Sequence, residues 1–225
     1  MKTTDGKVTQ VLPGGQAMIV TALPEDVDDG VRVFWPDKDE ITPEQRRKIF
    51  AINGEIAAWS GDDPESVRKT LVSDFLLKKR QDIQMRTLSL ASGGGCDKGT
   101  ASLLIDFLIN LVLEYGIPTK QPLMEYADDL EKYTYAALMN KKCLVCGKKA
   151  DLHHAEGSMI GMGYNRNEKC QIGAMVMPLC RTHHGEYHQI GATAFDAKYH
   201  TVAVPMDKRI ADKYGLTRKA KGESE

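Results

Sequence analysis

The chain lacks several features that commonly reveal a function. Its 225 residues contain no histidine before position 153 and only one cysteine before position 143. No run approaches the roughly 20 consecutive apolar residues of a membrane-spanning helix, and the first residues contain no apolar signal segment. The net charge is only −1, so the overall charge balance indicates no partner. We therefore expect no membrane association and a reducing cytoplasm, where clustered cysteines bind metals more often than they form disulfides.

Unusual residues are concentrated in the last third of the chain. A hydrophobic content of 42% and a charged content of 27% are ordinary for a globular protein. All six histidines follow position 152, and four of the five cysteines follow position 142. Residues 141–225 carry 14 Lys or Arg and 9 Asp or Glu, whereas residues 1–140 carry 16 and 22. We therefore expect a separate, mildly basic C-terminal unit whose charge suits a polyanion.

The first 140 residues predict strands followed by helices. Apolar runs broken by turn-forming residues predict β structure over residues 7–35. Thr42-Pro43 predicts a helix start, because Thr42 can cap the free amides and Gln45 completes a capping box. A basic, strand-like stretch is expected over Lys78–Leu90. Further helices are expected from Asp63-Pro64, from Asp97 to Gly116, and from Pro122 to about Asn140.

Two short pairs of metal-binding residue types follow. Cys143 and Cys146 form a CxxC motif, and Cys180 and His183 have the same spacing after 33 intervening residues. Together they complete a Cys3His set, which is typical of tetrahedral structural zinc. A lone CxxC motif also serves redox chemistry, but the second pair favours zinc (Zn²⁺).

Four further histidines accompany these pairs. His153 and His154 follow the first pair, and His184 and His188 are four residues apart just after the second. At roughly 100° per residue, a helix here would direct Cys180 and His183 toward one edge and His184 and His188 toward the other. The spacing therefore predicts a structural zinc on one side of this helix and a second metal on the other.

These motifs resemble those of the HNH endonucleases, the ββα-metal nucleases. The resemblance is carried by Cys143-x2-Cys146, Leu152-His153-His154, Leu179-Cys180-Arg-Thr-His183-His184 and His188. In that family a β-hairpin carries the histidine pair, and the following helix carries the other ligands. The resemblance implies hydrolysis of DNA phosphodiester bonds with one divalent cation, such as Mg²⁺ or Mn²⁺.

The resemblance also implies roles for the four histidines. His154 would be the catalytic general base that deprotonates the attacking water, a task that suits an imidazole titrating near neutral pH. The catalytic cation would neutralise charge on the scissile phosphate and on the leaving 3′ oxygen. Its ligands would be His153, His184 and His188.

One position departs from the HNH pattern. The family's middle Asn usually stands a few residues before the Leu-Cys of the second pair, and here Met175 is near that place. Asn165 and Asn167 lie earlier, in a glycine-rich loop, and either is an alternative for orienting His154. The missing Asn favours a rival hypothesis, in which the C-terminal unit binds DNA without cutting it.

The remaining polar residues of this region have simpler interpretations. Cys170 and His200 are not expected to be ligands, because both sites are already filled, and Cys96 is most simply a small neutral residue. Three cationic residues are candidates for phosphate contact, with solvated surface charge as the alternative. They are Arg166, Lys169 and Arg181.

Residues 30–135 resemble the lambda Orf (NinB-type) phage recombination mediators. The resemblance rests on Thr42-Pro-Glu-Gln-Arg-Arg-Lys-Ile49, Trp59, Ser89–Gly95 and Glu114-Tyr-Gly-Ile-Pro118. It implies a homodimer that binds single-stranded or branched DNA and acts with a recombinase and single-strand binding protein. Trp59 would be a base-stacking platform. The implied backbone contacts are Arg46, Arg47, Lys48, Lys78, Lys79, Arg80 and Arg86.

The sequence thus predicts an α+β protein of two domains. Residues 1–137 would form an Orf-like strand-plus-helix domain, residues 138–210 a small zinc-stabilised ββα-metal (HNH) nuclease domain, and residues 211–225 a charged tail. The predicted function is phage-type recombination with DNA cleavage, in the cytoplasm of the bacterial host. Two alternatives stay open: a non-catalytic recombination mediator, and a restriction-type HNH nuclease with an unrelated N-terminal reader.

Overall fold

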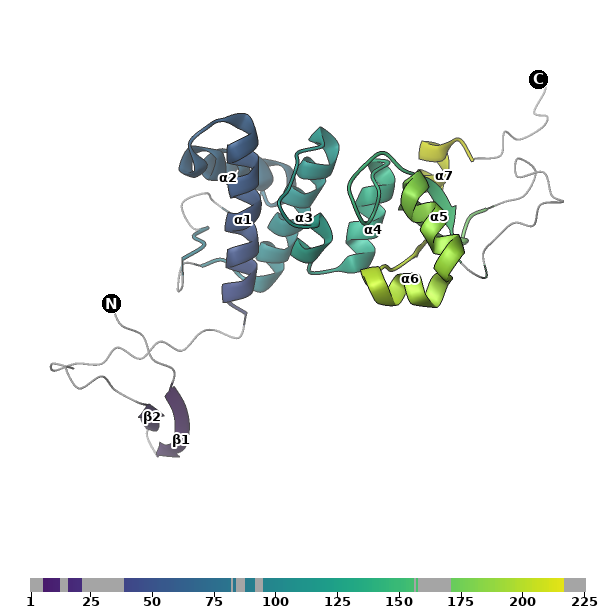
Figure 1. Cartoon of the computed structure of the whole chain (residues 1–225). Coiled ribbons are helices and arrows are strands. Elements are labelled where there is room, and N and C mark those ends of the chain that lie inside the picture. The colour runs from purple at the N-terminus through teal and green to yellow at the C-terminus, as the bar shows by residue number, and fades with distance from the viewer. Residues whose placement is uncertain are drawn as a thin grey trace, which may run out of the picture. The chain divides into compact units, whose positions relative to one another are not determined.

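The computed structural model describes residues 6–12, 16–21, 39–81, 83, 88–91, 95–155, 157 and 171–216 (Figure 1). The chain divides into two compact units, Met1–Pro36 and Asp37–Glu225. The first contains an antiparallel hairpin of β1 (Gly6–Leu12) and β2 (Gln16–Thr21), which confirms part of the predicted β structure. The rest of that prediction, including residues 31–34, lies outside the described residues.

Helix α1 (Pro43–Ser60) begins with the predicted capping box. The Gln45 amide donates to the Thr42 hydroxyl at 3.0 Å, and the Thr42 amide donates to the Gln45 side chain at 3.1 Å. These reciprocal bonds satisfy backbone donors that no helical carbonyl can reach. The helix ends at Gly61 in the left-handed conformation and buries an apolar face that includes Ile49, Ile52 and Ile56.

Helices α2 (Pro64–Lys79) and α3 (Lys98–Tyr115) also begin at predicted caps, Asp63 and Asp97. The strand predicted over Lys78–Leu90 is wrong at its start, because Lys78 and Lys79 form the last turn of α2. The apolar face of α2 continues into this turn, and Lys78 forms an ion pair with Asp74 at 2.8 Å, one helical turn earlier. Residues 82 and 84–87 lie outside the described residues.

The fourth predicted helix is interrupted. A 3₁₀ turn, η1 (Leu123–Tyr126), follows Pro122, and helix α4 (Leu130–Met139) begins separately. Asp129 causes the new start, because its side chain accepts hydrogen bonds from the amides of Glu131 and Lys132. The prediction of one helix from Pro122 to Asn140 is therefore wrong, although its C-terminal half is helical.

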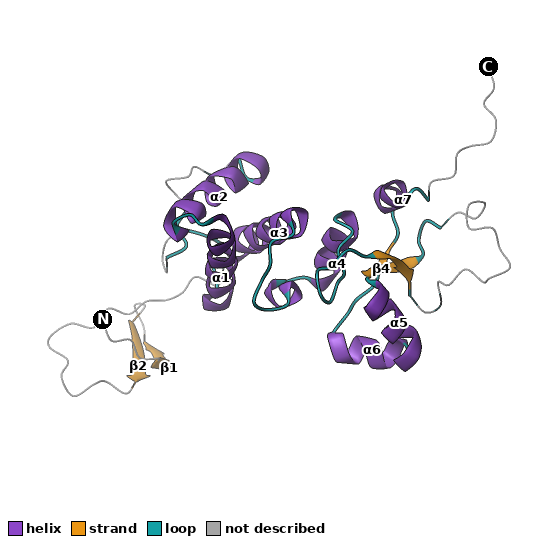
Figure 2. Ribbon diagram, turned by 45° about the horizontal axis from the view of Figure 1, so that its top comes forward, coloured by secondary structure: helices purple, strands orange, loops and turns teal. Residues whose placement is uncertain are grey.

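The C-terminal part contains a small antiparallel sheet in the order β3-β4-β5. Figure 2 shows this sheet next to α4, between α7 and the α5–α6 pair. The hairpin followed by a helix is the arrangement that the HNH resemblance implies. The elements are β3 (Asp151–His154), β4 (Met175–Leu179), β5 (Val204–Pro205), α5 (Arg181–Ile190), α6 (Ala192–Tyr199) and α7 (Lys208–Tyr214).

One hydrophobic core joins α1–α3 to the CxxC turn and the small sheet. The Tyr133 hydroxyl donates to the Leu144 carbonyl at 3.2 Å, which links α4 to the turn between Cys143 and Cys146. The domain boundary predicted at residues 137/138 falls inside α4, whose Leu138 packs with Val176 in a second, smaller cluster. The described part is thus mixed α+β, and none of its helices is long and apolar enough to cross a membrane.

Candidate functional site

The two cysteine-containing segments meet at the amino end of α5. An antiparallel bridge between Lys142 and Lys149 closes the CxxC turn, where the Gly147 amide donates to the Cys143 carbonyl at 2.9 Å. Gly147 has φ +67°, a left-handed conformation that residues with a Cβ rarely adopt. Cys180 is the N-cap of α5. The first turn of the helix therefore carries His183 toward the two cysteines of the turn.

The distances between the ligand atoms of this Cys3His set match the edge lengths of a tetrahedral zinc site. Cys146 Sγ and Cys180 Sγ lie 3.8 Å apart, and His183 Nδ1 lies 3.4 Å from Cys143 Sγ and 3.3 Å from Cys180 Sγ. With Zn–S near 2.3 Å and Zn–N near 2.0 Å, tetrahedral geometry requires S–S and S–N edges of about 3.8 and 3.5 Å. The four side chains could therefore hold one zinc ion with little rearrangement.

Protonation at the Cys3His set follows from burial and hydrogen bonding. Burial raises the pKa of the Cys143 thiol to about 12. Burial acts in the same direction on Cys180, but hydrogen bonds from the His183 amide and from the other thiols outweigh it, so that the pKa of Cys180 is lowered. A thiolate at the amino end of a helix is also favoured by the helix dipole. Cys180 is accordingly the readiest anionic ligand.

Three imidazoles converge on the opposite side of α5. Strand β3 supplies His153, and α5 supplies His184 and His188, whose Nε2 atoms are 3.0 Å apart. The candidate ligand atoms of the three residues all lie within 4.8 Å of one another. His153 is 3% exposed, and its buried Nε2 has no hydrogen-bond partner among the described residues. An unpartnered buried nitrogen between two other imidazoles fits a metal ligand.

The surroundings keep His153 neutral, as a metal ligand must be. Burial, followed by the neighbouring imidazoles of His184, His188 and His154, lowers the pKa of His153 to about 4. The ring of Tyr187 packs edge-on against His153 at a centroid distance of 4.3 Å. Tyr187 is itself buried, so its ring restricts the orientation of the His153 imidazole.

His154 lies beside this cluster with a partner that the sequence analysis missed. Its Nε2 is 2.9 Å from Oε1 of Gln171, which is 4% exposed. The HNH pattern places an Asn near Met175, which is the first residue of β4 and has no side-chain amide. Asn165 and Asn167 lie outside the described residues. The sequence signal that could have identified Gln171 is its side-chain amide four residues before β4, the strand that pairs with the histidine-bearing β3.

The comparison with family models decides the relationship of this chain. Residues 17–216 match the model of a family described as "Putative HNHc nuclease". The chain belongs to the HNHc nuclease family. The match includes the Cys3His set, the cluster of three imidazoles and helices α1–α7, so the HNHc nuclease family model spans nearly the whole described part. No curated protein and no solved structure matches the chain.

In this HNHc nuclease chain the cationic residues suggested for DNA contact differ in their surroundings. Lys48 forms an ion pair with Asp128 at 2.8 Å, and Arg80 donates to the Thr100 hydroxyl. Arg47 and Lys79 are exposed, and Arg46 is half-buried. Lys78 pairs with Asp74, and Arg181 lies 3.3 Å from Asp151 while remaining 92% exposed. The other candidates, Arg86, Arg166 and Lys169, lie outside the described residues.

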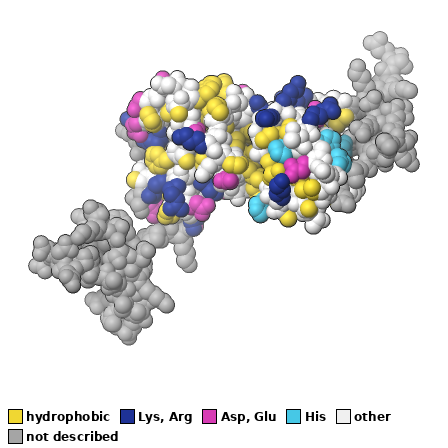
Figure 3. All heavy atoms as spheres, in the orientation of Figure 1, with side chains coloured by type: hydrophobic (Ala, Val, Ile, Leu, Met, Phe, Trp, Pro, Cys, Tyr) yellow, Lys and Arg dark blue, Asp and Glu magenta, His cyan; other side chains and the backbone are white. Residues whose placement is uncertain are grey.

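Two other candidates of the HNHc nuclease chain, Cys96 and His200, do not join either set of candidate metal ligands. Burial raises the pKa of Cys96 to about 11, so this thiol is neutral at physiological pH. His200 is exposed and follows α6 in the left-handed conformation. Cys170 lies outside the described residues. Histidine side chains come to the surface over the part of the molecule that contains α5 and α6 (Figure 3).

Proposed function

We propose that this protein is a metal-dependent DNA endonuclease, in which His153, His184 and His188 hold one divalent cation. The observation that carries the proposal is the buried Nε2 of His153, which has no hydrogen-bond partner among the described residues and faces two imidazoles. Membership of the HNHc nuclease family supports the reaction type. A cation bound there would neutralise charge on the scissile phosphate and on the leaving 3′ oxygen.

His154 is proposed as the general base. It adjoins His153 on β3, and its Nε2 is engaged by Gln171. If that nitrogen donates its proton to Gln171 Oε1, the Nδ1 atom carries the lone pair that can accept a proton from the attacking water. Gln171 is thus proposed as the positioning residue for His154, in the role that the missing Asn left open.

The Cys3His set is proposed to bind a structural zinc. It consists of four protein ligands, which leaves no position for water or substrate, as in other structural zinc sites. Because Cys180 begins α5, a zinc ion there would fix the amino end of the helix that carries His184 and His188. Its expected contribution is therefore to position the second metal site.

A cleavage assay tests the catalytic proposal. Wild-type protein should cut DNA when Mg²⁺ or Mn²⁺ is added, and His154→Ala should lower the rate by about 10²-fold or more, the usual contribution of a general base. His154→Ala should still bind Mn²⁺, which separates loss of the base from loss of the metal. His200→Asn is the matched control, because an exposed histidine is replaced by a residue that tolerates the left-handed conformation.

Two outcomes would contradict the proposal, the first the nuclease activity and the second the role of His154. If wild-type protein cuts no DNA with either cation, the non-catalytic recombination mediator becomes the better hypothesis. If His154→Ala cuts as fast as wild type, another group is the base. Both results leave the zinc proposal intact, because zinc content is measured separately.

The substrate is proposed to be single-stranded or branched DNA in recombination. Trp59 supports this, because its ring is 52% exposed and lies 6.5 Å from that of Tyr115, which is also exposed. Bases of unpaired DNA stack on such rings. Trp59→Ala should weaken binding to a single-stranded oligonucleotide more than binding to a duplex, as competition titrations would show. Preferential cutting of modified duplex DNA would instead favour the restriction-type alternative.

A further inference from the structure

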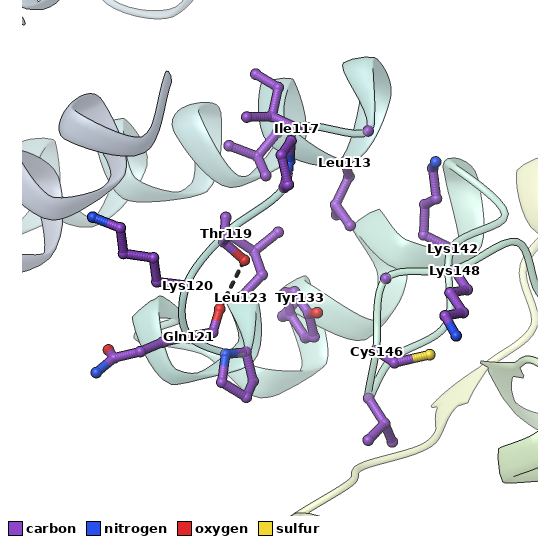
Figure 4. A pocket seen from close by; sticks show the side chains of 16 residues that line it. Leu113, Ile117, Thr119, Lys120, Gln121, Leu123, Tyr133, Lys142, Cys146 and Lys148 are labelled. Carbon is purple, nitrogen blue, oxygen red and sulfur yellow. Dashed lines mark hydrogen bonds between the residues drawn. The ribbon is translucent and has the colours of Figure 1, made fainter. Parts of the chain in front are cut away.

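A groove of about 490 Å³ lies between the loop that follows α3 and the CxxC turn (Figure 4). It is not part of the cluster of three imidazoles, because His153, His184 and His188 do not line it. Three lysines line it, namely Lys120, Lys142 and Lys148, and we call it the lysine groove.

The charge of the lysine groove is of one sign. Its three lysines are the only charged side chains among the described residues that line it. None of the three forms an ion pair with an acidic group in the part of the chain that the structure describes. The nearby carboxylate of Glu55 accepts from the backbone amide of Lys120 at 3.3 Å, but it does not line the groove. An anion in the groove would therefore meet three ammonium groups that form no ion pair with any described acidic side chain.

Lys142 lines the groove beside the end of a helix. Gly116 ends α3 with φ +64°, and a Cβ built on it would lie 3.1 Å from Lys142 Nζ. The ammonium group thus lies over the carboxyl end of α3, where the helix dipole favours a cation. Lys142 is half-buried, whereas Lys120 and Lys148 are exposed.

The walls of the groove combine these cations with an apolar surface. Figure 4 shows Lys142, Lys148 and Cys146 on the side of the CxxC turn, with Lys120 on the opposite loop. Leu123 and Tyr133 lie between the two sides and are buried. A hydrogen bond from the Thr119 hydroxyl to the Gln121 carbonyl at 2.7 Å braces the loop. The groove therefore offers an apolar floor below a cationic rim.

We propose that the lysine groove binds the sugar-phosphate backbone of a DNA strand at a point separate from the cleavage centre. The charge of its rim matches the phosphates, and the apolar floor matches deoxyribose. The proposal rests on the proposed function, since it takes DNA to be the substrate of the cleavage centre. Lysine contacts of this kind set the register of the strand and do not read its sequence.

The Cys3His set connects this groove to the cleavage centre. Cys146 lines the groove and belongs to the set, and Cys180 of the same set begins the helix that carries His184 and His188. A strand bound in the groove is thereby placed at a fixed distance from the imidazole cluster. This link explains how groove contacts would influence where the strand is cut.

The salt dependence of DNA binding tests the proposal. We compare wild-type protein with Lys120→Ala/Lys148→Ala on a mixed-sequence duplex oligonucleotide in EDTA-free buffer without Mg²⁺ or Mn²⁺, so that binding is measured without cutting. Each phosphate contact adds about 0.9 to the slope of log K against log salt for duplex DNA. The double variant should bind about tenfold more weakly at low salt. The slope of log K against log salt should be less steep by about 2.

Two further variants make the test specific. Lys208→Ala/Lys213→Ala removes two exposed lysines from α7, outside the groove, and should bind DNA like wild type with an unchanged slope. Lys142→Glu should weaken binding further, although it also disturbs the end of α3. The zinc content of every variant is measured, because Lys142 and Lys148 flank the CxxC motif.

The possible results separate this proposal from the nuclease proposal. If wild-type protein cuts DNA but Lys120→Ala/Lys148→Ala has its affinity and slope, the groove proposal is overturned and the nuclease stands. If the groove variant loses DNA affinity while wild-type protein cuts nothing, the groove proposal stands alone. Binding to polyglutamate is measured for the same variants. If Lys120→Ala/Lys148→Ala loses polyglutamate binding but keeps wild-type DNA affinity, the groove binds an acidic protein and the proposal is overturned.

Discussion

At the scale of single residues, the central observation is how differently the environment treats neighbouring histidines. His153 is buried without a hydrogen-bond partner among the described residues, whereas the adjacent His154 is half-buried and contacts Gln171. Successive residues of a strand face opposite sides, so two adjacent histidines can have separate tasks. The His153 side faces the other imidazoles, and the His154 side faces the amide.

Replacement of Gln171 tests its positioning role. Gln171→Leu should lower kcat for DNA cleavage by about 10-fold to 100-fold, because His154 loses the group that fixes its tautomer and orientation. KM for DNA, Mn²⁺ affinity and the melting temperature should stay near the wild-type values. Gln171→Glu, which keeps an acceptor oxygen at the same reach, should retain most of the activity. If the melting temperature of Gln171→Leu falls together with kcat, Gln171 is a merely structural residue.

At the scale of secondary-structure elements, the helix caps are the features that local sequence predicts best. Thr42, Asp63 and Asp97 all cap helices at the predicted positions, because a cap bonds to amides only two or three residues away. The errors occur where a second local signal competes. Asp129 caps a new helix inside the one predicted from Pro122. The apolar face of α2 extends to Leu76, so the helix continues through Lys78, where a strand was predicted.

The cap of α3 gives a prediction about stability and pH. Hydrogen bonds from Thr100 are the main reason that the pKa of Asp97 lies below its usual value. A folded-state pKa below the unfolded value stabilises the fold at neutral pH, and this stabilisation is lost as the pH falls through the folded-state pKa. Asp97→Ala should cost about 1 kcal/mol at pH 7, and less near pH 3, in urea unfolding. Asp97→Asn, a neutral cap, should lose less at pH 7; an Ala penalty equal at both pH values would refute this.

The Cys3His set, formed by the CxxC turn and the amino end of α5, gives a prediction about zinc. Cys180→Ser should abolish tightly held zinc, as measured by atomic emission, and unfold residues 141–210, because ligand binding and folding are coupled there. A loss of several kcal/mol corresponds to a fall of about 10 °C or more in melting temperature. Cys96→Ala is the control, since this buried cysteine is outside the set and should leave zinc content unchanged. Wild-type zinc content in Cys180→Ser would disprove the Cys3His assignment.

At the scale of the whole molecule, the part with the candidate metal ligands and the helices α1–α3 share a core. Local spacing predicts which of these residues lie together around α5, because Cys180 and His183 are three residues apart and His184 and His188 are four residues apart. It does not predict the contact between His154 and Gln171, which lie 17 residues apart and meet only when β3 pairs with β4. The resemblance of residues 30–135 to recombination mediators stays a prediction, since the HNHc nuclease family match covers this region without a second family.

The shared core predicts where an independent metal-binding fragment can begin. A fragment of residues 128–216 keeps Asp129, α4 and the bond from Tyr133 to Leu144, so it should fold and bind zinc. A fragment of residues 138–216 lacks most of α4, which packs on β4, and should be largely unfolded by circular dichroism with added zinc. Equal folding of both fragments would show that α4 is dispensable and would support the domain boundary at residue 138.

The most direct test of the central claim is an anomalous-scattering map of crystals loaded with Mn²⁺. The account predicts a manganese peak within coordination distance of His153, His184 and His188, with His154 not coordinated, and a separate zinc peak at the Cys3His set. A manganese peak elsewhere, no peak at the three imidazoles, or a peak coordinated by His154 would contradict it.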